Sequence, residues 1–287
     1  MSGKRNDDYG ITVYSPLHKA LNYILLAITS LIILSPILVV LNIAFKTDQE
    51  YLETAFYELP DSLLYLDNFI TVFRDGDLLR AFSNTFILIV VSVFFNIAMG
   101  TMTAYVLGRF QFPLKKFLLG AFILASIIPW VVTQVATFTI IQNLGIFNTI
   151  FAGMVLYMAT NVLQIYIFLQ FMDNIPLELD ESALIDGASY LKIYFSIILP
   201  LMKPAIATVC ILSTIHIYND MLTPYLYMPK TSLKTVTTAL MKFSYDRNSN
   251  WTVMGAGIIT VMIPTLVMYL GLQKFILAGI TDGAIKA

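Results

Sequence analysis

Six long apolar segments, separated by polar stretches, dominate the pattern of the chain. They cover residues 21–45, 82–107, 117–141, 150–172, 205–227 and 251–275. A bilayer core about 30 Å thick needs about 20 apolar residues in a helix that rises about 1.5 Å per residue. Each segment meets that length, and lipid offers no partners for unpaired backbone groups. The pattern therefore predicts an all-α integral membrane protein with six transmembrane helices.

Composition supports this prediction and excludes several classes of protein. Apolar residues make up 58% of the chain and charged residues 12%, whereas soluble domains carry about 25% charged residues. The net charge of -1 offers no basic surface for nucleic acid. The chain has two histidines, one cysteine and no Gly-x-x-x-x-Gly-Lys-Ser/Thr loop. We therefore expect neither an enzyme nor a metal site nor an ATPase.

Loop charges predict the orientation of the helices. The loop over 108–116 holds three basic residues and no acid, whereas acids dominate the loop over 46–80. By the positive-inside rule, both termini of this multi-pass chain face the cytoplasm. We divide the chain into a cytoplasmic N-terminal segment (1–20), the first transmembrane helix with its extracytoplasmic loop (21–80), a core transmembrane domain (81–277) and a cytoplasmic C-terminal tail (278–287).

Helix-interrupting and small residues lie inside the predicted spans. Prolines at positions 36, 129, 224 and 264 each remove an amide donor and favour a kink. Gly100, Ala104 and Gly108 form a small-residue stripe at four-residue spacing. Such a stripe lets another helix approach closely. The stripe serves either packing within the chain or contact with another subunit.

The predicted cytoplasmic loop over 173–204 is long, since connections in compact domains mostly have about 4–6 residues. Asn174 is the expected N-cap of a first helix, with Pro176 in its first turn. The acids Glu178, Asp180 and Glu181 favour a helix N-terminus electrostatically. This part of the loop is therefore predicted to be helical.

The rest of the loop predicts a second helix. Gly187 permits a sharp turn, Ser189 is the expected cap of the next helix, and Pro200 is expected to end it. An apolar stripe recurs at helical spacing, at Leu177, Leu184, Ala188 and Leu191. We predict a helix–turn–helix with a buried apolar side and an exposed acidic side, suited to mechanical contact with another protein.

Three short runs in this loop resemble the EAA loop of ATP-binding-cassette importer permeases, whose pattern is Glu-Ala-Ala, Asp-Gly-Ala and Ile-x-Leu-Pro. They are Glu181-Ser182-Ala183, Asp186-Gly187-Ala188 and Ile198-Leu199-Pro200. Ser182 replaces the first alanine of the pattern and is small enough to keep the packing. The run Tyr218 to Leu222 resembles the Trp-Asn-Asp-Phe-Leu segment of sugar permeases. The run Gln273 to Lys286 resembles the tail of the maltose-type second permease.

The resemblance implies the transmembrane domain of a type I importer in a prokaryotic inner membrane. It implies that the loop docks in a cleft of the ATPase through Glu181, Ser182, Ala183, Asp186, Gly187, Ala188, Leu199 and Pro200. It implies as partners a homologous second permease subunit, two copies of a cytoplasmic ATPase, an extracytoplasmic sugar-binding protein that touches the loop over 228–250, and membrane lipid. The tail would reach between the ATPase subunits. No cofactor is expected on this chain, because ATP and magnesium belong to the ATPase.

Polar and aromatic residues within the spans are candidates for a substrate path: Gln134, Asn161, Gln164, Asn219, Asp220 and Tyr225. For the amides, a helix–helix hydrogen bond is the alternative to substrate contact, and for tyrosine the alternative is anchoring at the membrane interface. A charge at the bilayer centre costs at least about 3 kcal/mol, so Asp220 should face protein or water.

Two functions remain open at this point. The first is an importer permease for a sugar that works by alternating access, for which the resemblance implies an α-galactoside or maltodextrin-like oligosaccharide. The second is an ion-coupled secondary transporter, for which Asp220 would be the acidic candidate in a proton relay.

Overall fold

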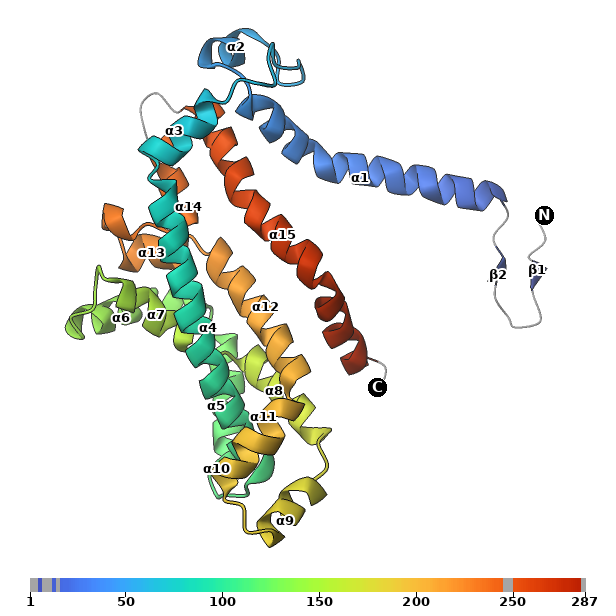
Figure 1. The fold of residues 1–287 in the computed structure, drawn as a ribbon, viewed down its shortest axis with the longest axis vertical. Coiled ribbons are helices and arrows are strands. Elements are labelled where there is room, and N and C mark those ends of the chain that lie inside the picture. Colours follow the sequence, from blue (N-terminus) through green and yellow to red (C-terminus); the bar gives the residue numbers. More distant parts are fainter. Residues whose placement is uncertain (1–4, 7–11, 14–15, 245–249, 285–287) are drawn as a thin grey trace.

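The computed structural model is a bundle of helices in which α4 runs from the end that carries α3 to the end that carries α9 (Figure 1). The structure describes residues 5–6, 12–13, 16–244 and 250–284. Two strands, β1 (Arg5–Asn6) and β2 (Thr12–Val13), pair antiparallel. The helices are α1 (Pro16–Ala44), α2 (Asp48–Glu53), α3 (Asp67–Asp75), α4 (Leu78–Arg109), α5 (Lys115–Ile127), α6 (Trp130–Asn143), α7 (Ile150–Met158), α8 (Val162–Asp173), α9 (Glu178–Ile185), α10 (Tyr190–Ile193), α11 (Leu199–Leu201), α12 (Lys203–Asn219), α13 (Leu222–Tyr227), α14 (Val236–Leu240) and α15 (Trp251–Ala284), with a π-helical turn at Tyr194–Ile198 and 3-10 turns at Thr231–Leu233 and Met241–Phe243.

The described helices provide up to six membrane-crossing segments, as the apolar pattern predicts. α1, α4 and α15 are each long and apolar enough to cross a bilayer, and three bent helix pairs provide up to three further spans. The all-α fold with six spans is therefore confirmed. The third, fourth and fifth predicted spans are each divided between two helices.

The third span is bent by 105° between α5 and α6. Pro129 lies at the bend, and Ile128 before it is extended, with φ -74° and ψ 117°. A proline lacks the amide donor and disfavours a helical conformation of the residue before it. The kink expected at Pro129 is thus confirmed, and its size divides the predicted helix into two.

Inside the predicted fourth and fifth spans the helices are interrupted at polar residues, whereas the 73° bend at Met202, just before the fifth span, lies between Pro200 and Pro204. α7 and α8 meet at an angle of 44°, and the side chain of Asn161 caps α8 by accepting from the amide of Gln164 at 2.8 Å. α12 ends at Asn219, and the chain continues through Asp220 into α13. The side chains of asparagine and aspartate compete with the helix for backbone hydrogen bonds. A hydropathy profile does not detect this property.

The small-residue stripe on α4 faces α8. A Cβ atom added at Gly100 would lie 2.9 Å from Phe168 Cε2, and one added at Gly108 would lie 2.7 Å from Met172 Cγ. Ala104, between them, is fully buried in the same apolar cluster as Phe168 and Met172. The stripe therefore serves close packing within the chain.

At the opposite end, α4 holds the segment that leads into α14. Asn84 Nδ2 donates to the carbonyl oxygens of Ser232 and Lys234, at 2.9 Å each. Thr85 Oγ1 accepts from the amide of Val236 at 3.1 Å. The segment before α14 is thus attached to α4 through its backbone.

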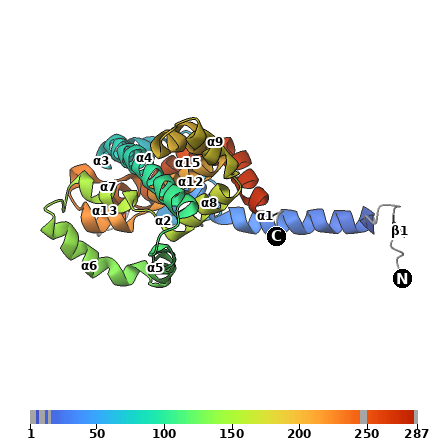
Figure 2. The same cartoon turned by 90° about the horizontal axis from the view of Figure 1, so that it is seen from below.

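α1 stands away from the bundle over most of its length (Figures 1 and 2). Its large apolar side chains from Leu17 to Leu38 keep between 40% and 78% of their surface exposed. Only its last turns pack on α15, where a Cβ added at Gly255 would lie 3.3 Å from the carbonyl oxygen of Val40. Such a surface suits lipid or another membrane subunit.

Replacing Gly100 with leucine should destabilise the bundle, because the new side chain would displace Gln164 and Phe168 from the α4–α8 contact. Overpacking of this kind costs about 1–3 kcal/mol. Thermal unfolding of the detergent-solubilised protein should show a lower midpoint. Gly120→Leu is the matched control, since nothing lies within 4 Å of a Cβ added there. Equal midpoints for the two variants would contradict the packing described for Gly100.

Candidate functional site

The loop between α8 and α12 folds into a hairpin, defined here as residues 177–201, that projects from one end of the bundle (Figure 1). α9 ends in a tight turn in which the amide of Gly187 donates to Leu184 at 3.0 Å and the amide of Ala188 donates to Ala183 at 2.9 Å. Gly187 has φ +81°, a conformation that side chains disfavour. The sharp turn predicted at Gly187 is confirmed.

The second arm of the hairpin begins as the sequence predicts. Ser189 caps α10, with its hydroxyl oxygen accepting from the amide of Lys192 at 3.3 Å. The helix passes through a π-helical turn into α11 and bends by 73° at Met202. The helix ends at Leu201, one residue after Pro200, close to where Pro200 was expected to end it.

The start of the first arm also differs from the prediction. Asn174 caps the C-terminus of α8, and its Nδ2 donates to the carbonyl oxygen of Gln170 at 2.8 Å. α9 begins four residues later, at Glu178, without a side-chain cap. Asn174 follows α8 directly, and in this position its side chain reaches a carbonyl of the preceding turn. The N-cap role expected for Asn174 is therefore wrong.

The apolar stripe predicted to be buried in the hairpin is largely exposed. Leu177, Leu184 and Leu191 keep 50%, 38% and 63% of their surface, and Ile185 keeps 87%. Periodicity marks an apolar face but does not say whether the same chain covers it. The acids Glu178, Glu181 and Asp186 are exposed, as expected. The hairpin therefore presents apolar and acidic groups side by side.

The residues resembling the EAA pattern are divided between this surface and the interior. Glu181, Ser182, Asp186 and Gly187 are exposed, and so is Pro200, at the far end of the second arm. Ala183, Ala188 and Leu199 are half-buried and pack against the apolar cluster below the hairpin.

Asp180 is the one acid of α9 that is buried, and it pairs with Arg109 at the end of α4. Arg109 Nε lies 2.8 Å from Asp180 Oδ2, with 10% and 9% of the two side chains exposed. The contact is a charge pair without a well-directed hydrogen bond, because Arg109 Nε has no acceptor among the described residues. Arg109 Nη2 donates to the carbonyl oxygen of Ile175 at 2.9 Å. Nothing local in the sequence reveals this pair.

Two of the candidate path residues lie together near the break in the fourth span. Asn161 and Gln164 line a cavity of about 250 Å³ between α8 and α12, with Ser213 and His216 on its other side. Gln164 Nε2 donates to the carbonyl oxygen of Asn96 on α4 at 3.0 Å. Both amides therefore make bonds within the bundle, and contact with a substrate stays a prediction.

Asp220 lies at the break in the fifth span and is held by four donors. Its carboxylate accepts from the hydroxyl groups of Tyr157 at 3.0 Å and Thr223 at 2.5 Å. It also accepts from the amides of Leu222 at 2.8 Å and Thr223 at 3.2 Å. The expectation that Asp220 faces protein or water is met by this network. Asn219 is exposed, and its Nδ2 donates to Ile215 of its own helix at 3.0 Å.

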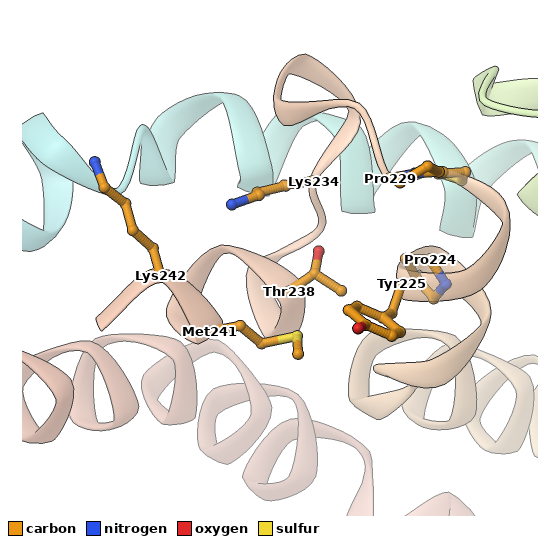
Figure 3. Close-up of a pocket in the computed structure, with 8 residues that line it drawn as sticks. Pro224, Tyr225, Pro229, Lys234, Thr238, Met241 and Lys242 are labelled. Carbon is orange, nitrogen blue, oxygen red and sulfur yellow. The ribbon is translucent and has the colours of Figure 1, made fainter. Parts of the chain in front are cut away.

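Gln134 and Tyr225 lie apart from these groups. Gln134 Oε1 accepts from the hydroxyl of Tyr227 at 2.5 Å. Tyr225 lines a pocket of about 410 Å³ at the opposite end of the bundle from the hairpin, which Lys234 and Lys242 also line (Figure 3). The candidate path residues thus do not converge on one site. The described residues hold no group of three or more His, Cys, Asp or Glu side chains that could bind a metal ion.

A carbonyl and a carboxylate accompany Lys242 beside this pocket. Lys242 Nζ donates to the carbonyl oxygen of Asp75 at 2.7 Å. The hydrogen-bonded guanidinium of Arg74 lowers the pKa of the Asp75 carboxyl below its usual value. Asp75 and Lys242 both line a neighbouring pocket of about 260 Å³, which therefore carries charges of both signs.

Comparison with known proteins places the chain in a transport family. Residues 97–281 match the family described as binding-protein-dependent transport system inner membrane component. The chain is 31% identical over 255 residues to the melibiose/raffinose/stachyose import permease protein MelC of Bacillus subtilis (strain 168), covering 88% of this chain and 91% of MelC. It is 32% identical over 262 residues to the probable starch degradation products transport system permease protein AmyC of Thermoanaerobacterium thermosulfurigenes, covering 90% and 94%.

A solved structure shares the fold. The bacterial ABC transporter involved in the import of the acidic polysaccharide alginate superposes with a TM-score of 0.81 at 22% identity, over 92% of this chain and 99% of that chain. The family match includes the hairpin and both polar breaks. The chain therefore belongs to the inner-membrane components of binding-protein-dependent transport systems, as a permease subunit of the carbohydrate-importing ABC type.

Proposed function

We propose that an ATPase drives this permease through the hairpin. The observation that carries the proposal is the hairpin surface, where Leu177, Ile185 and Leu191 are exposed beside the carboxylates of Glu181 and Asp186. Exposed apolar groups of this size favour a protein partner. A helix lying on a membrane surface would carry basic residues on its polar face. A cleft with apolar walls and basic or donor groups at its rim matches this hairpin.

The docking element consists of the residues that resemble the EAA pattern. The exposed carboxylates of Glu181 and Asp186 would meet donor groups of the ATPase, and the turn at Gly187 would fix the angle between the two arms. Ser182, Ala183, Ala188, Leu199 and Pro200 would supply the packing that keeps the element rigid. Because α9 is one short helix with a tight turn at its end, a displacement of the ATPase would move it as a unit.

The proposed function also assigns each end of the bundle to one side of the membrane. The α9 end and both termini would face the cytoplasm, and the pocket with Tyr225 would face the outside. Two copies of the ATPase would hold ATP and magnesium, and this chain would bind no cofactor. A homologous second permease and lipid would cover the exposed apolar surface of α1. A sugar-binding protein would deliver substrate to the outer loop over 228–250.

Transport would proceed by alternating access. Closure of the ATPase dimer would move the hairpin and open the path towards the outside, and hydrolysis of ATP would reset it. The relatives MelC and AmyC are named for melibiose, raffinose and stachyose and for starch degradation products. We therefore assign a neutral oligosaccharide of the α-galactoside or maltodextrin type as the substrate.

An ion-coupled mechanism receives no support from Asp220. The four donors on its carboxylate make it a cap that closes the break between α12 and α13. A proton relay needs an acid that exchanges partners along a path. Asp220 instead stabilises the fold, because its carboxylate binds Tyr157 on α7 and the amide of Leu222 at the start of α13.

Replacing Gly187 with valine should uncouple ATP hydrolysis from uptake, because a side chain at φ +81° strains the turn by about 1–3 kcal/mol. Uptake per ATP hydrolysed in proteoliposomes should fall while membrane insertion persists. Gly145→Val is the matched control, since Gly145 has φ +69° and, like Gly187, has nothing within 4 Å of an added Cβ. Parental coupling in Gly187→Val would defeat the assigned docking role.

Crosslinking from Glu181→Cys should capture the ATPase. Cys210 is the single cysteine of the chain, so a Cys210→Ser background gives one defined label. Adducts with a nucleotide-hydrolysing subunit are expected from Glu181→Cys and not from Tyr57→Cys, an exposed position in the loop at the opposite end. Adducts with lipid alone from Glu181→Cys would remove the basis for an ATP-driven importer.

The energy source separates the two transport mechanisms directly. Uptake of labelled oligosaccharide by cells that hold ATP constant should continue when the proton gradient is collapsed. The ATP-driven importer predicts little change in rate, since hydrolysis supplies the free energy. A rate that falls with the proton gradient would favour the ion-coupled transporter.

A further inference from the structure

α4 connects the two ends of the bundle without interruption. It has 32 residues, contains no proline, and at about 1.5 Å per residue is about 48 Å long. At one end, Asn84 and Thr85 hold the segment before α14. At the other end, Arg109 pairs with the hairpin. The helix therefore contacts both surfaces at which proteins outside the bilayer would bind.

The Arg109–Asp180 pair differs from the other ion pairs of the described chain. Its side chains are about nine-tenths buried, whereas those of Arg80 and Asp77, which lie three residues apart, are 58% and 50% exposed. Burial reduces the screening of charge by water. A buried charge that loses its partner is strongly disfavoured, so the pair resists separation. It joins α9 to α4 at a fixed distance.

The other arm of the hairpin is attached to the same end of α4. The hydroxyl of Tyr105 donates to the carbonyl oxygen of Tyr190 at 3.4 Å, and its ring lies 5.5 Å from that of Tyr194. The ring of Phe110 meets that of Tyr190 edge to face at 5.1 Å. Both arms of the hairpin are therefore attached to α4, and a movement of either arm would displace α4.

The covalent connections of the hairpin are less direct. Towards α8, residues 174–177 are non-helical, and towards α12 the chain bends by 73° at Met202. A displacement of α9 passing through these connections would be absorbed by their bending. The contact with α4 instead connects the hairpin to the opposite end of the bundle through one uninterrupted helix, which would transmit a displacement of α9 without bending.

We propose that α4 is a lever and that the Arg109–Asp180 pair is its joint with the hairpin, both residues acting by positioning. This inference rests on the proposed function. Displacement of the hairpin by the ATPase would reach the segment before α14 through α4. Because coupling between two binding sites is reciprocal, a protein that docks on that segment would change the affinity of the ATPase for the hairpin through the same helix.

The test uses the complete transporter in proteoliposomes and measures uptake per ATP hydrolysed, a ratio that does not depend on the amount of folded complex. Arg109→Gln should lower this ratio by at least about fivefold, the lower end of coupling between sites. The exchanged pair, Arg109→Asp with Asp180→Arg, should restore most of it. Arg80→Gln, which breaks an exposed pair, should change it by less than about twofold.

Three results would overturn the lever: an unchanged ratio in Arg109→Gln, an equal loss in Arg80→Gln, or no recovery in the exchanged pair. If Arg109→Gln fails to assemble, the double variant Phe94→Gly/Phe95→Gly serves as the test. Both side chains are exposed, so their loss leaves the packing intact, and two glycines make the middle of α4 less rigid. Parental coupling in that variant rejects the lever. A parental complex that takes up sugar without hydrolysing ATP would instead reject the proposed function, and the lever with it.

Discussion

The apolar interior of a bilayer supplies no hydrogen-bond partners, so every backbone group that leaves a helix needs one within the protein. This chain leaves a helix inside its fourth span and again in its fifth, and polar side chains meet the requirement. Asn96 Nδ2 donates to the carbonyl oxygen of Ala159 at 2.9 Å where α7 ends. Asn161 and Asp220 accept the first amides of the segments that follow. These bonds make bent spans stable, and Asn161 at the first break also lines the cavity between α8 and α12.

α4 supplies much of this support. Its asparagines hold carbonyl oxygens at two levels, Asn84 near one end and Asn96 near the middle. Its small residues admit α8, so Gln164 can reach the backbone of Asn96. Polar amides and small residues on one helix thus serve the same purpose: they bring the irregular parts of other helices close enough to be satisfied.

The number of spans follows from apolar length alone, because the bilayer sets that length. The turn at Gly187 and the cap at Ser189 could be predicted since both depend on residues within one helical turn. Asn174 was predicted as a cap from the same rules, but it caps the preceding helix, because the rules do not locate the end of α8. Arg109 and Asp180 could not be paired in advance, since only the path of α4 through the bundle brings them together.

Polar breaks in the spans are the hardest feature to predict. An asparagine or aspartate in an apolar run lowers hydropathy only slightly, whether it bonds to a neighbouring helix or interrupts its own. Asn161 and Asp220 interrupt their helices, whereas Asn96 lies inside an intact one. The difference lies in which carbonyl and amide groups stand opposite each side chain, and this is a property of the tertiary structure.

The exposed leucine and isoleucine side chains of the hairpin have a consequence for biosynthesis. If the ATPase covers the hairpin as proposed, a subunit made in excess over that partner would expose these side chains to water, Ile185 most of all. Such patches promote aggregation and attract chaperones and proteases. Balanced synthesis of all components, as from a single transcript, would keep orphan copies rare and spare the cell the burden of clearing them.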